Sequence, residues 1–233
     1  MDLFYKTNIV SEHLILDPDE SAHSVKVLRY GKGDRVRLID GKGGFYVAEI
    51  EHADPTACEV RIISKSTNHE KLPYELHIAI APTKRLDRFE WFVEKATEIG
   101  VSSITPLFCQ RSERRNIRLD RIKRVAIAAM KQSVKAYLPR IFEPIGYSDW
   151  IETRVTGSKF IAHCMDGAKM DIRTVELSDA ITIIIGPEGD FTPEEVMMAI
   201  QNDYEPLSLG DYRLRTETAG VVACSAVYLK ATR

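Results

Sequence analysis

The sequence AITIIIGPEGDF, residues 180–191, decides the fold class of this chain of 233 residues. Its first six residues are mostly β-branched, and such a short apolar run predicts a strand that is buried on both faces, as in a parallel sheet. Gly186 and Gly189 then allow close approach to the main chain, and Thr192 with Glu195 forms a capping box that starts a helix. Strand, glycine loop and helix together predict a ligand site at the carboxyl end of the strand, although an ordinary tight turn explains the spacing equally well.

A second glycine-ended strand follows at Leu209–Gly210, and a charged segment comes directly after it. Arg213, Arg215 and Glu217 precede an apolar-rich helix that we expect at residues 219–229. Charged residues in this place indicate the edge of a site, and a solvated loop before a helix is the alternative interpretation.

Residues 73–233 alternate between strand-like and helix-like patterns. We expect strands at 76–81, 103–108 and 160–164, and helices at 87–99 and from 119 to about 137. Alternating strands and helices predict an α/β domain with a mostly parallel sheet and helices on both faces.

Residues 1–72 contain short alternating strands instead, at 35–39, 45–51 and 58–63, with a glycine turn at 41–44. Short strands at close spacing predict a small β-barrel. The polar segment 64–73 is expected to be a linker, so we predict two domains, 1–72 and 73–233. The pattern alone leaves open whether the barrel binds a ligand or only stabilises the protein.

The composition is that of an ordinary globular protein, with 44% hydrophobic and 28% charged residues. No apolar run approaches the ~20 residues of a membrane span, and the N-terminus lacks the pattern of a signal peptide. The cysteines and histidines show no metal-ligand spacing, and no two cysteines are close in sequence. We therefore expect a cytoplasmic protein without a metal or a membrane partner.

A basic stripe occupies residues 111–140, although the net charge of the whole chain is only −2. The stripe holds ten Lys or Arg and two acids, a local charge of +8. Such a stripe is a candidate phosphate-binding surface, and a solvated helix face is the alternative for most of its members. Arg111, Arg114 and Arg115 are the better candidates for RNA contact because they precede the predicted helix.

The motifs GPEGDF at 186–191, LG at 209–210 and LRTETA at 214–219 resemble those of the bacterial 16S ribosomal RNA uridine N3-methyltransferases. Lys84, residues 95–101, Arg111-Ser112 and Gln132 extend the resemblance over most of 82–233. It implies the SPOUT superfamily with a C-terminal trefoil knot, a PUA-like RNA-binding barrel and a homodimer. It also implies S-adenosylmethionine as cofactor and 16S ribosomal RNA of the small subunit as substrate. Asp190 stands where the family usually has a glycine, and Tyr212-Arg213 where it usually has Arg-Ile.

The resemblance and the strand-end loops together give three sets of candidate site residues. The cofactor is expected to lie against the main chain of three loops, represented by Cys164, Ile185, Gly186, Gly189, Leu209, Tyr212 and Leu214. The candidates for RNA binding are Arg29, Lys84, Arg111, Arg114 and Arg115. The candidates for catalysis are Glu217 as a base or orienting carboxylate, and Arg215 and Arg111, which would stabilise charge on the uracil oxygens or bind phosphate. The alternatives are an acid that only stabilises the start of a helix for Glu217, and structural ion pairs for the two arginines.

Two other classes of function remain open at this point. A non-catalytic RNA-binding protein would use the barrel and the basic stripe and would have no cofactor affinity. A doubly wound kinase or oxidoreductase is disfavoured because the sequence contains neither Gly-x-Gly-x-x-Gly nor the phosphate-loop pattern.

Overall fold

The computed structural model describes residues 2–232, which form two compact units. The first unit comprises residues 2–71 with 127–138, and the second comprises 72–126 with 139–232. Helix α3, Leu119–Gln132, therefore contributes its first half to the second unit and its second half to the first.

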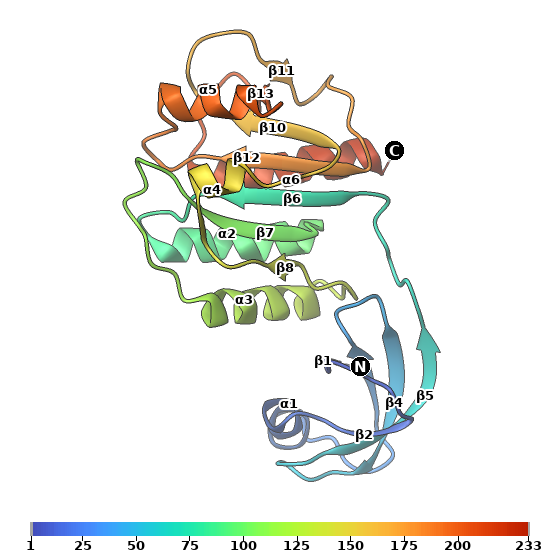
Figure 1. Ribbon diagram of the computed structural model, residues 1–233. Helices are drawn as coiled ribbons and strands as arrows, with labels where there is room; N and C mark the ends of the chain where they lie inside the picture. The colour runs from blue at the N-terminus through green and yellow to red at the C-terminus, as the bar shows by residue number, and fades with distance from the viewer. Residues whose placement is uncertain (1, 233) are drawn as a thin grey trace. The chain divides into compact units, whose positions relative to one another are not determined.

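The second unit is built on a parallel sheet of eight strands, in the order β11-β13-β10-β12-β6-β7-β8 with β9 also on β7 (Figure 1). The β-branched run Ala180–Ile185 forms strand β12, which lies in the sheet between β10 and β6. The strands are β6 Glu75–Ile80, β7 Ser103–Phe108, β8 Arg140–Ile141, β9 Ile145–Gly146, β10 Ser158–Ala162, β11 Met170–Asp171, β12 Ala180–Ile185 and β13 Glu205–Ser208. The helices that lie wholly in this unit are α2 Leu86–Ile99, α4 Tyr147–Ile151, α5 Pro193–Gln201 and α6 Thr216–Ala231.

Helices cover both faces of this sheet, as the alternating pattern predicted. On one face, Ile184 of β12 shares a buried cluster with Trp150 of α4 and Val196 of α5. On the other face, α6 packs against α2, β6 and β12. A Cβ placed on Gly220 of α6 would lie only 2.5 Å from Phe92 of α2, so the glycine permits the close approach of the two helices.

Two predicted boundaries were wrong. The helix expected to reach about residue 137 ends at Gln132, because Val134 adopts a left-handed conformation (φ 58°) and the amide of Lys135 donates back to the carbonyl of Met130. A valine rarely ends a helix in this way, so no residue pattern marks this end. The expected linker from residue 64 begins too early, since Ser64, Lys65 and Ser66 still pair with β4.

The first unit is a curled mixed sheet in the order β1-β3-β4-β5-β2. Only β1 and β3 are parallel, and the register of β4 with β5 shifts twice, which bends the sheet around its core. Fully buried Phe4, Val36 and Leu38 are among the residues that fill that core. The elements are β1 Leu3–Tyr5, β2 His13–Ile15, α1 Pro18–Ala22, a π-helix at His23–Val27, β3 Arg35–Ile39, β4 Phe45–His52 and β5 Glu59–Ser66.

No helix within residues 2–232 is long and apolar enough to cross a membrane.

Candidate functional site

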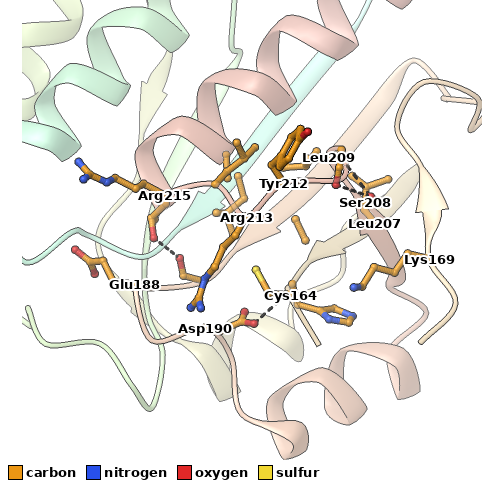
Figure 2. Close-up of a pocket in the computed structure, with 18 of the residues that line it drawn as sticks. Cys164, Lys169, Glu188, Asp190, Leu207, Ser208, Leu209, Tyr212, Arg213 and Arg215 are labelled. Carbon is orange, nitrogen blue, oxygen red and sulfur yellow. Dashed lines mark hydrogen bonds between the residues drawn. The ribbon is translucent and has the colours of Figure 1, made fainter. Parts of the chain in front are cut away.

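A cavity of about 650 Å³ lies at the carboxyl ends of three neighbouring parallel strands, β12, β10 and β13 (Figure 2). The ends of these strands and the loops that follow them supply almost all of its lining, at residues 162–164, 185–188, 190 and 207–216. Ligands of open α/β sheets bind at such strand ends, and the volume is typical of a small-molecule site.

The loop after β12 is fixed by the main chain and by one carboxylate. The amide of Asp190 donates to the carbonyl of Pro187 at 2.9 Å, and Asp190 adopts a left-handed conformation with φ 62°. Its side chain accepts hydrogen bonds from the amides of Cys164 and Phe191, each at 2.9 Å. Asp190 therefore ties the end of β10 to the loop after β12 across the cavity wall (Figure 2).

The start of α6 is tied to the same loop. The hydroxyl of Thr216 donates to the carbonyl of Gly186 at 3.0 Å, and both groups lie in the cavity wall. The predicted capping box is present at the start of α5, where the Thr192 hydroxyl accepts from the amide of Glu195. Glu195 also accepts from the amide of Gln110 at 2.8 Å, which joins the loop after β7 to this region.

His163 faces the cavity without a hydrogen bond of its own. Both ring nitrogens are buried, and neither has a partner among residues 2–232. Burial, together with the Lys169 ammonium nearby, lowers the pKa of His163, and the Asp190 carboxylate opposes this shift. The imidazole is therefore neutral at pH 7 and offers one donor and one acceptor to a ligand.

Most of the residues that the sequence suggested for the cofactor line this cavity, with Cys164 exposed and Ile185 buried. Gly189 does not line the cavity. Its carbonyl accepts a hydrogen bond from Arg111 at 2.9 Å, and a Cβ there would meet the Arg111 side chain at 3.3 Å. The residues that line the cavity as expected are Cys164, Ile185, Gly186, Leu209, Tyr212 and Leu214.

Arg213, one of the charged residues expected at the edge of a site, lines the cavity, and Figure 2 shows it extending from its loop toward the loop that carries Asp190. Sequence reasoning missed other lining residues, among them His163 and Lys169. No motif marked His163 or Lys169, because their relevance depends on which strand ends are neighbours in the sheet.

The basic candidates of the second unit lie at the neighbouring strand ends. Arg111 also donates to the carbonyl of Phe191, and Arg114 donates twice to the carbonyl of Lys84, at 2.9 and 3.1 Å. The Lys84 side chain pairs with Glu113 at 2.8 Å. These side chains therefore hold the loops after β6, β7 and β12 together, and most of them remain exposed to solvent.

The two remaining basic candidates are arranged differently. One guanidinium nitrogen of Arg115 lies 3.4 Å from each of the carbonyls of Cys109 and Gln110. Arg29 belongs to the first unit, where it has φ 60°.

Glu217 does not line the first cavity. It lies in a second cavity of about 400 Å³, formed by α2 and the start of α6. Arg215 lines both cavities, so the two adjoin each other. Arg88 and Trp91 of the second cavity were not identified from the sequence, because more than a hundred residues separate them from Glu217.

No cluster of three or more His, Cys, Asp or Glu that could hold a metal ion occurs in the part of the chain that the structure describes.

Comparison with known families defines the class of protein. A family model described as an RNA methyltransferase domain matches residues 70–228, and a model of an RNA methyltransferase PUA domain matches residues 16–63. The chain is 30% identical to the ribosomal RNA small subunit methyltransferase E of Rickettsia conorii, over 92% of this chain and 88% of that protein. The chain therefore belongs to the RNA methyltransferase family that includes ribosomal RNA small subunit methyltransferase E.

Solved structures agree with this membership. A structure described as a probable rRNA-methyltransferase from Porphyromonas gingivalis is 40% identical, with a TM-score of 0.92 over 100% of this chain and 99% of that one. The ribosomal RNA small subunit methyltransferase E of Neisseria gonorrhoeae, bound to S-adenosyl methionine, is 27% identical, with a TM-score of 0.89 over 99% and 98%. The family resemblance drawn from the motifs is thus confirmed, and the kinase or oxidoreductase alternative is not supported.

Proposed function

We propose that the protein transfers a methyl group from S-adenosylmethionine to N3 of a uridine in 16S ribosomal RNA of the small ribosomal subunit. The observation that carries this proposal is the cavity at the carboxyl ends of β10, β12 and β13, in a chain that belongs to the RNA methyltransferase family. Relatives named for ribosomal RNA small subunit methylation support the substrate. The non-catalytic alternative lacks a comparable supporting observation.

The chemistry of the cavity wall fits this cofactor. Main-chain groups of three loops can bind an adenine ring and its ribose, and the unpartnered nitrogens of His163 supply a further donor and acceptor. Bound S-adenosylmethionine would supply a methyl group on a sulfonium. The residues that we assign to holding it are Cys164, Ile185, Gly186, Leu209, Tyr212 and Leu214, with Gly189 acting indirectly through its loop.

Glu217 and Arg215 are our candidates for catalysis. A uracil carries its N3 proton at neutral pH, so a carboxylate beside it can accept that proton. Arg215 lies at the boundary of the two cavities and can stabilise the negative charge left on the uracil oxygens. We assign Arg111 a positioning role, because its guanidinium holds the carbonyls of Gly189 and Phe191.

RNA phosphates are assigned to exposed basic groups. Lys84, Arg114 and Arg115 lie near the strand ends that carry the first cavity, and Arg29 is the candidate of the first unit. Such contacts orient the RNA without selecting its sequence. In this scheme residues 1–72 form the RNA-binding domain and residues 73–233 the methyltransferase domain.

The proposal includes a trefoil knot and a homodimer in the cytoplasm. Strand β13 lies on the far side of β10 from β12, whereas α6 packs on β6 and β12, so residues 209–215 cross the ends of two strands. This crossing supports the knot. Helix α6 is largely apolar and exposes two adjacent large side chains near its end, Tyr228 and Leu229, a surface that a second copy of the chain would cover in the homodimer that we propose from the family resemblance.

Isothermal titration calorimetry tests the proposal, with S-adenosylmethionine as ligand and ATP and NAD as controls. We expect binding of S-adenosylmethionine alone and its loss in Gly186→Val, whose Cβ would lie 3.0 Å from the buried ring of Phe191 and so displace the main chain that lines the cavity. Gly31→Val is the matched control, because no atom lies within 4 Å of a Cβ there.

Methylation of isolated small subunits, followed by mass spectrometry of the nucleosides, tests the reaction itself. We expect N3-methyluridine in 16S ribosomal RNA. Absence of S-adenosylmethionine binding, with binding of structured RNA retained, would instead establish the non-catalytic alternative.

A further inference from the structure

The second cavity contains an acidic group that no described contact satisfies. Glu217 is only 6% exposed, and its Oε1 lies 3.8 Å from Nε of Arg88. Its Oε2 is buried and has no hydrogen-bond partner within residues 2–232. Leaving a buried acceptor unsatisfied destabilises the protein, more so when the acceptor is charged, so a ligand that donates a hydrogen bond there would be stabilised.

The charges around this acceptor form a pattern. Arg88 and Arg215 both line the cavity with Glu217, which places hydrogen-bond donors and an acceptor in one wall. Asp87 also lines it, but its carboxylate is engaged by Arg85 at 2.8 and 3.2 Å. The wall therefore presents two guanidinium groups, of which Arg88 pairs with Oε1 of Glu217, and the second carboxylate oxygen, which has no partner among residues 2–232.

A uracil ring presents the complementary pattern. Its imide edge has two carbonyl acceptors, O2 and O4, with the N3–H donor between them. Cytosine has an acceptor at N3, which would face the Glu217 carboxylate unfavourably. The wall thus matches uracil and discriminates against the other pyrimidine.

Trp91 supplies an aromatic surface in the same cavity. It is 42% exposed, whereas the other tryptophan of the chain, Trp150, is 5% exposed and packs in the core. Stacking on an aromatic side chain is a common way for proteins to bind an unpaired base. A base that stacks on Trp91 would therefore explain why this indole is exposed beside charged groups.

We propose that the second cavity binds the target uracil, extruded from the RNA, with its ring on Trp91 and its imide edge on Glu217, Arg88 and Arg215. The inference rests on the proposed function and names Arg88 and Trp91 as residues that recognise the base. Extrusion is required because N3 is otherwise enclosed by stacking and pairing.

The same arrangement accounts for activation of the base. The N3–H bond breaks, the proton moves to Oε2 of Glu217, and the electron pair stays on the ring. The resulting negative charge is shared by N3, O2 and O4, next to the two guanidinium groups. Because Arg215 lines both cavities, the activated base lies beside the cofactor cavity.

Tryptophan fluorescence tests this proposal without cofactor and without turnover. The protein is titrated with uridine 5′-monophosphate, with cytidine 5′-monophosphate and 3-methyluridine 5′-monophosphate as controls. We expect quenching that saturates with uridine 5′-monophosphate and at least about tenfold weaker binding of both controls, equivalent to ~1.4 kcal/mol. Trp91→Phe is expected to abolish the change in signal.

Two variants locate the contact. Glu217→Gln and Arg88→Gln are each expected to weaken uridine 5′-monophosphate binding by about tenfold, in line with the loss of a charge-assisted hydrogen bond. Glu94→Gln is the matched control, since Glu94 lies on α2, pairs with Lys95 and does not line the cavity. Thermal unfolding of each variant identifies any that do not fold. If Glu217→Gln does not fold, nucleotide binding by Arg88→Gln tests the proposal.

The outcomes separate this proposal from the proposed function. Equal quenching by all three nucleotides, or unchanged binding in both variants, overturns the base site. Absence of quenching by uridine 5′-monophosphate while calorimetry still detects S-adenosylmethionine overturns the base site and leaves the methyltransferase function intact. Protection of Trp91 from iodide quenching in a dimer would likewise overturn it, because a second copy would then cover the cavity.

Discussion

The two cavities of the second unit share Arg215 but are built from different parts of the chain. The first is formed by the loops that follow β10, β12 and β13, which bring main-chain groups together with both apolar and charged side chains. The second is formed by side chains of α2 and α6, with an unsatisfied carboxylate in its wall. A main-chain site tolerates exchange of side chains, whereas a side-chain site does not.

This difference explains why the departures from the family pattern fall in the first cavity. Asp190, Tyr212 and Arg213 all line it. Tyr212 is 88% exposed, so its exchange leaves the strand ends unchanged. In the second cavity a change of one charged group would alter the chemistry directly.

The largest effect is expected in the side-chain cavity. Glu217→Gln removes the proton acceptor, and loss of general base catalysis lowers turnover about 100- to 10,000-fold. Affinity for S-adenosylmethionine should stay within about twofold, since Glu217 does not line the first cavity. Single-turnover methylation and calorimetry measure the two quantities. Turnover like that of the wild type would show that Glu217 is not the proton acceptor. The second cavity would then have no chemical role that distinguishes it from the first.

Asp190→Ala tests whether one side chain of the main-chain cavity is nevertheless important. It removes two hydrogen bonds, to the amides of Cys164 and Phe191, and leaves alanine in a left-handed conformation. We expect a loss of about 2–3 kcal/mol in the free energy of unfolding and about tenfold weaker cofactor binding.

Asp190→Gly is the informative companion variant, because glycine adopts a positive φ without strain. It should therefore be more stable than Asp190→Ala while still binding cofactor more weakly than the wild type. Cofactor affinity at the wild-type level in both variants would show that the carboxylate contributes nothing to this wall.

The first cavity could be partly predicted from the sequence, because some of the elements around it are formed by residues that are close together in the chain. The β-branched run of β12, the two glycines and the capping box at Thr192 and Glu195 each report on a few consecutive residues. The second cavity could not be predicted, because Arg88 and Glu217 meet only through the packing of α2 on α6. The end of α3 was missed for a related reason, since Val134 adopts its left-handed conformation against its own preference.

A smaller effect on cofactor binding is expected from loss of the hydrogen bond between the Thr216 hydroxyl and the Gly186 carbonyl in the wall of the first cavity. Thr216→Val leaves the buried carbonyl of Gly186 without its partner, which costs about 1 kcal/mol or somewhat more. We expect about fivefold weaker S-adenosylmethionine binding in calorimetry and a small loss of thermal stability. Thr174→Val, at an exposed position, is the control and should change neither. An effect on turnover at saturating cofactor would show instead that Thr216 acts on the second cavity through its neighbour Glu217.

The smallest effect is the pH dependence of cofactor affinity that we expect from His163, which lines the first cavity. Burial and Lys169 lower the pKa of His163 from 6.5, so the folded protein binds fewer protons than the unfolded chain below that pH. Stability and affinity for a cationic ligand should both fall as the pH drops through the lowered pKa, by at most about tenfold in affinity per pH unit. Calorimetry from pH 8 to 5 should therefore show constant affinity near neutrality and a decline in acid. His163→Asn should remove that decline, and His52→Asn, at an exposed position of the first unit, should leave it unchanged. A decline that persists in His163→Asn would mean that another titrating group causes it, and protonation of His163 would then have no part in cofactor binding.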